Sequence, residues 1–247
     1  MPATPAWPPR SAPRLFVAGP LAEGAAIVLE GNPAHYLAKV MRVSPGDAVI
    51  LCDDLTGEWA SRVASVGKRE VELDVAERLR AREAVPDLWL CPALLKKDRF
   101  DLVLEKATEL GVAEIHPVVT RRCVADKLNP ERARALSVEA AEQCARTALP
   151  VLTGPVPLAA LLRDWPTGRT LFFADEHGGD AAAAAFAARP GPAALLIGPE
   201  GGFDEAERAA IRALPLASPI SLGPRILRGE TAAITAISVW MAAAGDW

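Results

Sequence analysis

The sequence predicts an α/β protein that begins with a smaller all-β part, and three observations support this fold class. Before Ala81, short segments of alternating apolar and polar residues recur at spacings of about eight to twelve residues, as in small β-barrels. From Asp87 on, apolar segments alternate with helical ones, which is typical of a parallel sheet. Near the end, two apolar strands each run into a glycine-rich turn that precedes a helix. We therefore predict two domains, residues 1–80 and 81–247.

The all-β part is predicted from apolar segments that are separated by turns. Residues 1 to about 14 are rich in proline and are expected to be extended or disordered. A helical segment at residues 35–43 is closed by the Ser-Pro-Gly-Asp turn at residues 44–47. The predicted strands cover residues 14–17, 27–31, 48–53, 58–66 and 70–79.

The second part is predicted as strands that alternate with helices, and the pattern changes between residues 76 and 86. Asp98 is expected to cap a helix that Gly111 ends. Further helices are expected at residues 130–149, 157–165, 180–188, from about residue 204, and at 229–244. Strands are expected at residues 88–95, 113–119, 170–175, 194–197 and up to residue 221.

The composition is that of an ordinary folded protein, with 51% hydrophobic and 23% charged residues. No apolar run approaches the roughly 18 residues of a membrane span, and the N-terminus lacks the apolar centre of a signal peptide, so a cytoplasmic protein is expected. The four cysteines and three histidines are far apart. This spacing predicts no metal site and reduced, mostly buried thiols.

The net charge of −4 argues against binding nucleic acid by bulk electrostatics, but basic residues gather locally. Either these clusters bind a phosphate backbone or they are solvated faces of the protein. The clusters are Arg121, Arg122, Lys127, Arg132 and Arg134; Lys96, Lys97 and Arg99; and Lys39 with Arg42. The dinucleotide fingerprint GxGxxG, the P-loop and the GxSxG elbow are missing, which disfavours nucleotide enzymes and serine hydrolases.

Several motifs in the same order resemble those of the RsmE family of 16S ribosomal RNA uridine N3-methyltransferases, within the SPOUT superfamily. The main blocks are LLIGPEGGF at residues 195–203 and SLGPRILRGETAAITA at residues 221–236. Further matches are residues 14–17, 35–42, 96–112, 121–123 and 142–146, so that the resemblance covers nearly the whole chain.

The resemblance implies an N-terminal PUA-like β-barrel that binds RNA and a C-terminal SPOUT α/β domain with a deep trefoil knot. It also implies a homodimer that binds S-adenosylmethionine and methylates N3 of a uridine in 16S rRNA of the small ribosomal subunit, uridine 1498 in that family. A contact through the apolar last helix, with Trp240, is expected for the dimer. The cofactor residues expected from the two turns and the strand end at Phe173–Asp175 are Ala174, Gly198, Glu200, Gly201, Leu222, Gly223, Ile226 and Leu227.

These residue types suit that cofactor. Glycines let the backbone approach a ligand, and Leu222, Ile226 and Leu227 offer apolar walls to an adenine ring. Uridine N3 must lose its proton before methyl transfer, and a guanidinium stabilises the resulting charge. Arg228 is the catalytic candidate, the alternative being a salt bridge to Glu200 or Glu230. Either glutamate is a candidate base, and the sequence does not choose between them.

Five basic residues are expected to contact RNA: Lys39, Arg42, Arg121, Arg122 and Arg146. For Arg146 a structural role is equally open, and His35 is expected to lie inside the barrel rather than to act as an acid or base. Two positions depart from the family pattern: Gly229 stands where threonine is common, and the segment after Arg146 lacks a second basic residue. The first departure is expected to loosen the start of the last helix.

Two other functions compete with uridine methylation. One is another SPOUT enzyme that modifies a ribose 2'-hydroxyl or a tRNA base, and an analysis of methylated nucleosides would separate the two. The other is an RNA-binding or assembly factor that keeps the fold without turnover. The intact turns argue against it, and failure to bind S-adenosylmethionine would favour it.

Overall fold

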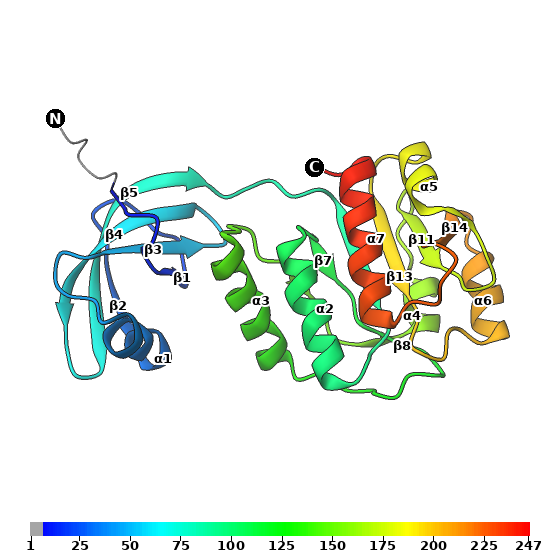
Figure 1. Cartoon of the computed structure of the whole chain (residues 1–247), viewed down its shortest axis with the longest axis horizontal. Coiled ribbons are helices and arrows are strands. Elements are labelled where there is room, and N and C mark those ends of the chain that lie inside the picture. The colour runs from blue at the N-terminus through cyan, green and yellow to red at the C-terminus, as the bar shows by residue number, and fades with distance from the viewer. Residues whose placement is uncertain (1–6) are drawn as a thin grey trace. The chain divides into compact units, whose positions relative to one another are not determined.

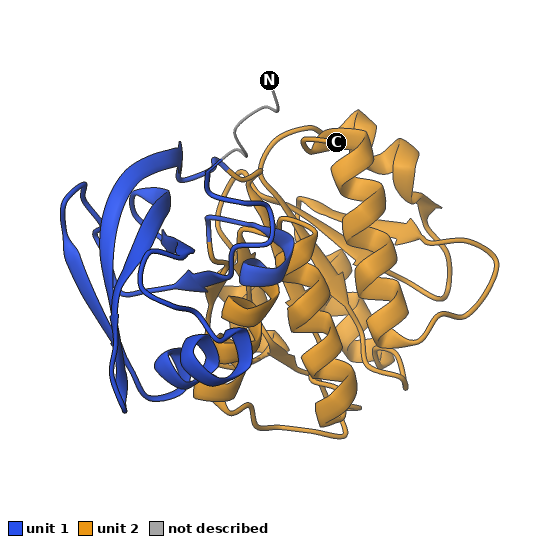
Figure 2. Cartoon of the chain, turned by 60° about the vertical axis from the view of Figure 1, so that its left-hand side comes forward, with its two compact units in different colours: residues 1–84, 141–148 blue, residues 85–140, 149–247 orange. Residues whose placement is uncertain are grey.

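The computed structural model describes residues 7–247, and the chain divides into two compact units (Figure 2). Unit 1 consists of the residues up to Ala84 together with the segment 141–148, and unit 2 of residues 85–140 and 149–247. The expectation of a disordered or extended start falls partly on residues 1–6, which lie outside the described residues. Within the described part, Ala12 N donates to Pro9 O at 2.9 Å, so residues 9–12 form a turn.

Unit 1 contains a five-stranded sheet with the order β1-β3-β4-β5-β2 (Figure 1). The first pair, β1 and β3, is parallel, and all other neighbours are antiparallel. The strands are β1 (Arg14–Phe16), β2 (Ala26–Glu30), β3 (Ala48–Asp53), β4 (Gly57–Val66) and β5 (Glu70–Ala81). Every predicted strand of this part is therefore present. Burial alternates along part of β5, as the period of two along a strand requires, whereas β3 is buried at every position.

The helical segment of unit 1 is a short helix that continues as a π-helix: α1 (Gly31–His35) and η1 (Tyr36–Met41). It ends at Arg42, which adopts the left-handed conformation with φ 55°. Leu37 is fully buried and joins Leu51, Leu73 and Trp59 in one apolar cluster under the sheet. His35 is exposed, which corrects the expectation that it lies inside this core.

The segment 141–148 joins unit 1 through hydrogen bonds that cross long stretches of sequence. Phe16 N donates to Glu142 Oε1 at 2.7 Å. Thr147 N donates to Glu83 Oε1 at 2.6 Å, and Glu83 N donates back to Thr147 Oγ1 at 2.9 Å. Arg146 lies in the same segment and is only 5% exposed. A structural place in unit 1 thus accounts for this stretch.

Unit 2 is built on a seven-stranded, fully parallel sheet with the order β12-β14-β11-β13-β6-β7-β9. A separate parallel pair is formed by β8 (Val118–Val119) and β10 (Val156–Pro157). The strands of the main sheet are β6 (Leu88–Pro92), β7 (Glu114–Ile115), β9 (Val151–Leu152), β11 (Thr170–Ala174), β12 (Asp180–Ala181), β13 (Ala193–Ile197) and β14 (Ala217–Ser221). The predicted strand at residues 113–119 is split, because Pro117 has no N–H to continue the ladder.

Helices cover both faces of this sheet. Residues of α2, α5 and α7 share one apolar cluster with Phe172 and Leu195, and residues of α4 and α6 share another with Phe173 and Leu196 (Figure 1). Successive strand residues face opposite layers, which explains the continuous apolar runs in the sequence. The helices are α2 (Lys97–Glu109), α3 (Pro130–Cys144), α4 (Leu158–Arg163), α5 (Ala182–Ala188), α6 (Glu205–Arg212) and α7 (Gly229–Ala244).

Three local expectations for unit 2 are corrected. Helix α2 begins at Lys97 after Lys96, so Asp98 lies in its first turn and is not its cap, whereas the end before Gly111 is as predicted. Helix α3 ends at Cys144, because Ala145 takes a positive φ of 64°, and does not reach residue 149. Trp240 is 2% exposed within the core of unit 2, so its side chain is not available as a dimer contact.

The thiols are consistent with the expected burial at two of four positions. Cys52 and Cys91 are buried, and burial is the main cause that raises the pKa of each to about 12. Cys123 and Cys144 are half-buried, and none of the four forms a disulfide in the described chain. None of the helices between residues 7 and 247 has both the length and the apolar character needed to span a bilayer.

Candidate active site

A pocket in unit 2 lies where three neighbouring parallel strands end. In the order β14-β11-β13, Ala174 pairs with Ile220 and Phe173 with Leu196, so the three carboxyl ends lie at one edge of the sheet. The loops that follow these strands, with parts of α6 and α7, line the pocket. Such an edge of an open α/β sheet is a common ligand site. The lining residues are Ala174, Asp175, Glu176, Gly178, Ile197, Gly198, Pro199, Glu200, Gly202, Phe203, Arg208, Ile220, Ser221, Leu222, Gly223, Pro224, Arg225, Ile226, Leu227, Gly229 and Ala232.

The structure brings together most of the residues predicted to bind a cofactor. Seven of the eight line this pocket: Ala174, Gly198, Glu200, Leu222, Gly223, Ile226 and Leu227. The eighth, Gly201, lies beside the lining residues Glu200 and Gly202, and its carbonyl oxygen accepts a hydrogen bond from Arg122 Nη1 at 2.7 Å. Two segments are named here for later use: the first turn is residues 198–203, and the second turn is residues 222–228.

The glycines of the first turn are required by close contacts. Gly202 has φ +65°, and a Cβ built there would lie 2.7 Å from Glu176 Oε1. Helix α7 begins equally close to this turn, since a Cβ at Gly229 would lie 3.0 Å from Leu95 Cδ2 and 3.5 Å from Gly198 O. A larger residue at either position would push the pocket wall outward. The glycine that departs from the family pattern therefore fits the tight packing of α7 against the first turn.

The lining divides into an apolar part and a charged part. The apolar side chains come mainly from β14 and the second turn, with Ile220, Leu222, Ile226 and Leu227. Ile226 is 91% exposed, which is unusual for a large apolar side chain in a folded chain. The charged side chains come from the loop after β11 and from α6, with Asp175, Glu176 and Arg208.

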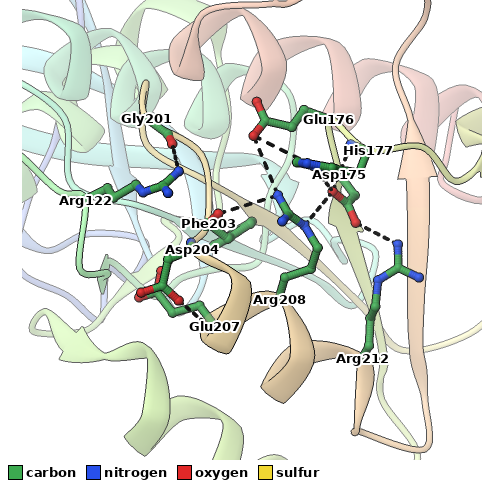
Figure 3. A network of polar contacts seen from close by, with 10 residues as sticks. All are labelled: Arg122, Asp175, Glu176, His177, Gly201, Phe203, Asp204, Glu207, Arg208 and Arg212. Carbon is green, nitrogen blue, oxygen red and sulfur yellow. Dashed lines mark hydrogen bonds and ion pairs between the residues drawn. The ribbon is translucent and has the colours of Figure 1, made fainter.

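Asp175 is the anchor of the charged part (Figure 3). Its side chain is fully buried and accepts hydrogen bonds from Arg208 Nε at 3.0 Å, Arg212 Nη2 at 2.7 Å and His177 N at 3.1 Å. Burial by itself acts to raise the pKa of Asp175, but these hydrogen bonds and the charge of Arg208 outweigh it and lower the pKa. The carboxylate of Asp175, with its pKa lowered in this way, holds Arg208 in the pocket wall.

Glu200 and Glu230 both face Arg99 at the start of α2. Arg99 Nη1 lies 2.6 Å from Glu200 Oε1, and Arg99 Nε lies 3.8 Å from Glu230 Oε1. The predicted alternative role for Arg228, a salt bridge to one of these glutamates, is therefore not what the structure has. Arg228 is exposed, lies between the lining residues Leu227 and Gly229, and forms no ion pair with any residue of the described chain. Sequence reasoning missed Arg99 because 101 positions separate it from Glu200.

The two arginines of the basic loop contact the first turn and the cap of α6: Arg122 donates to the Gly201 carbonyl (Figure 3), and Arg121 contacts the cap of α6. Arg121 N donates to Glu207 Oε1 at 2.8 Å, and Arg121 Nη1 donates to Asp204 Oδ2 at 2.8 Å. Asp204 and Glu207 in turn form the capping box that starts α6, as the sequence predicts for a helix near residue 204. Both arginines are also exposed to solvent. Each can therefore bind a phosphate either while it keeps its present contact or after it gives that contact up.

The other predicted RNA residues lie in unit 1. Lys39 and Arg42 are exposed, and Lys39 lines a hollow with His35, Lys68 and Arg69 between α1, η1 and the turn from β4 to β5. Sequence reasoning did not connect Lys68 and Arg69 with Lys39, because the hairpin and the helix are far apart in the chain. Arg146 offers no exposed guanidinium, since burial takes it out of water and lowers its pKa. Its expected RNA contact therefore finds no support in this position.

No three histidine, cysteine or acidic side chains gather around a metal-sized space anywhere in residues 7–247. What the pocket combines is an apolar wall, bare glycine backbone and a small set of fixed charges. This arrangement suits an organic ligand with an apolar ring and a charged end.

Comparison with known proteins places both units. Residues 82–241 match the model of a family described as an RNA methyltransferase domain, and residues 29–76 match that of an RNA methyltransferase PUA domain. Among curated proteins, the chain is 30% identical to ribosomal RNA small subunit methyltransferase E of Rickettsia conorii, over 91% of this chain and 93% of that protein. It is 31% identical to the protein of the same name from Bacillus subtilis, over 85% and 87%.

Two solved structures extend the likeness to the fold. A putative methyltransferase from Legionella pneumophila, in complex with the bound cofactor SAM, superposes with a TM-score of 0.86 and 31% identity over 96% of this chain and 99% of that one. A ribosomal RNA small subunit methyltransferase E from Neisseria gonorrhoeae, bound to S-adenosyl methionine, gives a TM-score of 0.86 and 26% identity over the same shares.

Proposed function

Since the chain belongs to the RNA methyltransferase family that includes ribosomal RNA small subunit methyltransferase E, we propose that it transfers a methyl group from S-adenosylmethionine to N3 of a uridine in 16S rRNA. The observation that carries the proposal is the pocket at the ends of β11, β13 and β14. Seven of the eight residues expected to bind the cofactor line it.

The pocket fits S-adenosylmethionine in size class and chemistry. Leu222, Ile226 and Leu227 supply apolar contact for the adenine ring, and the bare backbone of the first turn supplies peptide groups at close range. When bound, the cofactor supplies an electrophilic methyl group on a sulfonium. The chain's own contribution is to hold the base and that methyl group in line, because orientation alone lowers such a barrier substantially.

Arg228 is the residue we assign to charge stabilisation. Uridine N3 becomes a nucleophile only after it loses its proton, and the negative charge then spreads to the neighbouring carbonyl oxygens. Arg228 is exposed, lies in sequence between the lining residues Leu227 and Gly229, and carries a guanidinium that forms no ion pair with a carboxylate of the described chain. Its planar set of donors suits two oxygen acceptors at once. Glu230 has one buried carboxylate oxygen, Oε2, without a hydrogen-bond partner in the described chain, which leaves it a candidate for the base.

We assign RNA binding to exposed lysine and arginine side chains, some on unit 1 and others on unit 2. Unit 1 carries Lys39 and Arg42, and its residues 29–76 match the PUA domain model. Unit 2 carries Arg121 and Arg122 on the loop before α3. Exposed guanidinium and ammonium groups bind phosphates without reading sequence, which is the role expected of these side chains. Work on ribosomal RNA further leads us to assign the protein to the cytoplasm.

A deep trefoil knot and a homodimer complete the proposal. What supports the knot is that β13 and β14 lie on opposite sides of β11, while α7, which follows β14, packs against β13 and β6. The chain after β14 therefore returns past the ends of two strands. For the dimer, size-exclusion chromatography with light scattering should give twice the mass of 26.1 kDa.

The decisive experiment is methyl transfer from labelled S-adenosylmethionine to small-subunit particles and to free 16S rRNA, followed by nucleoside analysis. We expect 3-methyluridine as the product. Label in a 2'-O-methyl nucleoside or in tRNA would replace the proposal with another reaction of the same superfamily. Cofactor binding without any product on either substrate would favour an assembly factor.

A further inference from the structure

The proposed reaction gives no role to one carboxylate of the pocket, that of Glu176. Of the three acidic side chains in its lining, Asp175 is held by Arg208 and Arg212, and Glu200 is held by Arg99. Glu176 differs from both. It accepts no hydrogen bond from any residue of the described chain, and its nearest cations are Arg208 Nη2 at 3.6 Å and His177 Nδ1 at 3.9 Å.

The side chain of Glu176 lies against the first turn. Its Oε1 is 2.7 Å from where a Cβ of Gly202 would lie, so the carboxylate rests against the bare backbone of the first turn. Its side chain is 45% exposed and stands next to the guanidinium of Arg208 (Figure 3). An ionised carboxylate here keeps its lone pairs available to a ligand.

We propose that Glu176 binds the ammonium group at the amino-acid end of the cofactor, an inference that rests on the proposed function. A carboxylate is an acceptor only and needs a donor. The sulfonium offers none, the adenine amino group and the ribose hydroxyls offer neutral donors, and the ammonium offers three charged donors. A carboxylate forms a charge-assisted hydrogen bond with any of these donors, but only the ammonium adds the attraction of an opposite charge, so the ammonium is the best match.

Arg208 makes the charged part of the pocket complementary to a whole α-amino acid. Its guanidinium has five donor hydrogens, and it donates hydrogen bonds from Nε to Asp175 Oδ1 at 3.0 Å and from Nη2 to Phe203 O at 3.5 Å. Donors remain for the carboxylate of the same ligand. Glu176 and Arg208 thus present one negative and one positive group side by side, as an amino-acid zwitterion requires. Glu176 would therefore favour adenosyl compounds that carry an α-amino-acid group.

Three ligands and three variants of the chain, Glu176→Gln, Glu176→Asp and the control Glu205→Gln, test the assignment by calorimetric titration. The ligands are S-adenosylmethionine, S-adenosylhomocysteine and 5'-methylthioadenosine, which lacks the amino-acid end. We expect Glu176→Gln to weaken the first two about tenfold each and the third less than twofold. The control Glu205→Gln removes the same charge from exposed α6, outside the pocket lining, and should change none of them. Equal thermal unfolding of the three variants and wild type confirms that the folds are comparable.

The other outcomes separate the inference from the function on which it rests. Weakening of S-adenosylmethionine alone would mean that Glu176 acts on the sulfonium charge, and equal weakening of all three ligands would place it on the adenosine part. An unchanged Glu176→Gln variant would also overturn the inference, with cofactor binding intact. Wild type that binds none of the three ligands would overturn the proposed function itself. Partial recovery in Glu176→Asp, which keeps the charge on a shorter arm, is expected if the ammonium contact is correct.

Discussion

The two glycine-rich turns look like twins in the sequence, but the structure holds them very differently. The first turn is braced from outside: Arg99 holds Glu200, Arg122 holds the Gly201 carbonyl, and Gly202 N closes a tight turn onto Pro199 O at 2.9 Å. The second turn has a local contact between Gly223 N and Ser221 Oγ at 3.3 Å, and no ion pair to its arginines within the described chain. Similar composition therefore serves two tasks, a rigid frame and a set of side chains left free for ligands.

The largest effect on the reaction is expected from a change in the second turn. Arg228→Ala removes the guanidinium to which we assign stabilisation of the deprotonated base, and we expect the single-turnover rate of methyl transfer to fall about 10²- to 10³-fold. Cofactor affinity, measured by calorimetry, should stay within about twofold because Arg228 does not line the pocket. Arg189→Ala, at an exposed position beyond α5, is the matched control. A loss of cofactor binding in the Arg228 variant would instead make this arginine part of the pocket wall.

The next effect concerns the apolar wall of the second turn. Leu227→Asp should weaken S-adenosylmethionine binding at least about tenfold, since it replaces apolar contact worth roughly 1.5 kcal/mol or more and places a charge against the ring. Leu227→Met, which keeps apolar volume, should bind nearly as wild type. Leu216→Asp changes an exposed leucine outside the pocket and serves as control. Unchanged binding in Leu227→Asp would move the adenine site elsewhere.

A smaller effect is expected when the first turn loses one of its contacts. Arg122→Ala deletes the donor to Gly201 O, and we expect cofactor affinity to fall about threefold to tenfold with no RNA present, in line with one hydrogen bond from a charged group. Arg122→Lys should recover part of this loss, while Arg134→Ala, an exposed change of the same charge, should have none. If Arg122→Ala alters only RNA affinity, the first turn does not depend on this arginine. RNA binding would then be its only role.

The last prediction concerns the stability of the fold and the buried carboxylate of Asp175. Asp175→Asn leaves Arg208 and Arg212 without their anion, so the free energy of unfolding at pH 7 should fall by about 2 kcal/mol. Because folding lowers the pKa of Asp175, its contribution is present above the unfolded pKa of about 4 and is lost as the pH falls through the lower folded value.

Denaturant titrations at pH 7 and at progressively lower pH measure this dependence. The difference between wild type and Asp175→Asn should shrink below about pH 4, whereas Asp126→Asn, an exposed control, should match wild type throughout. A difference that stays constant with pH would assign the loss to packing and not to charge.

The strand order and the pairs of distant charges mark the limit of sequence reasoning. Apolar runs such as residues 194–197 predicted the strands, because a strand buried on both faces has no polar positions. The start of α6 near Asp204 and the start of α7 at Gly229 were also predicted from local residues. Arg99 with Glu200 was not, because which exposed charges meet depends on the packing of elements far apart in the chain. The burial of Arg146 was hidden for the same reason, since the segment 141–148 belongs to unit 1, whose other residues lie far away in the sequence.

The return of residues 141–148 to unit 1 bears on how this protein can be taken apart. The chain passes between the units after Ala84, after Ala140 and after Ala148, so neither unit is a single uninterrupted stretch. A fragment cut after Ala84 would lack Glu142 and Thr147, the partners of Phe16 and Glu83. Unit 1 therefore cannot be exchanged between genes by a single crossover. A transfer of unit 1 to another enzyme has to include residues 141–148, so the two units are expected to be inherited together.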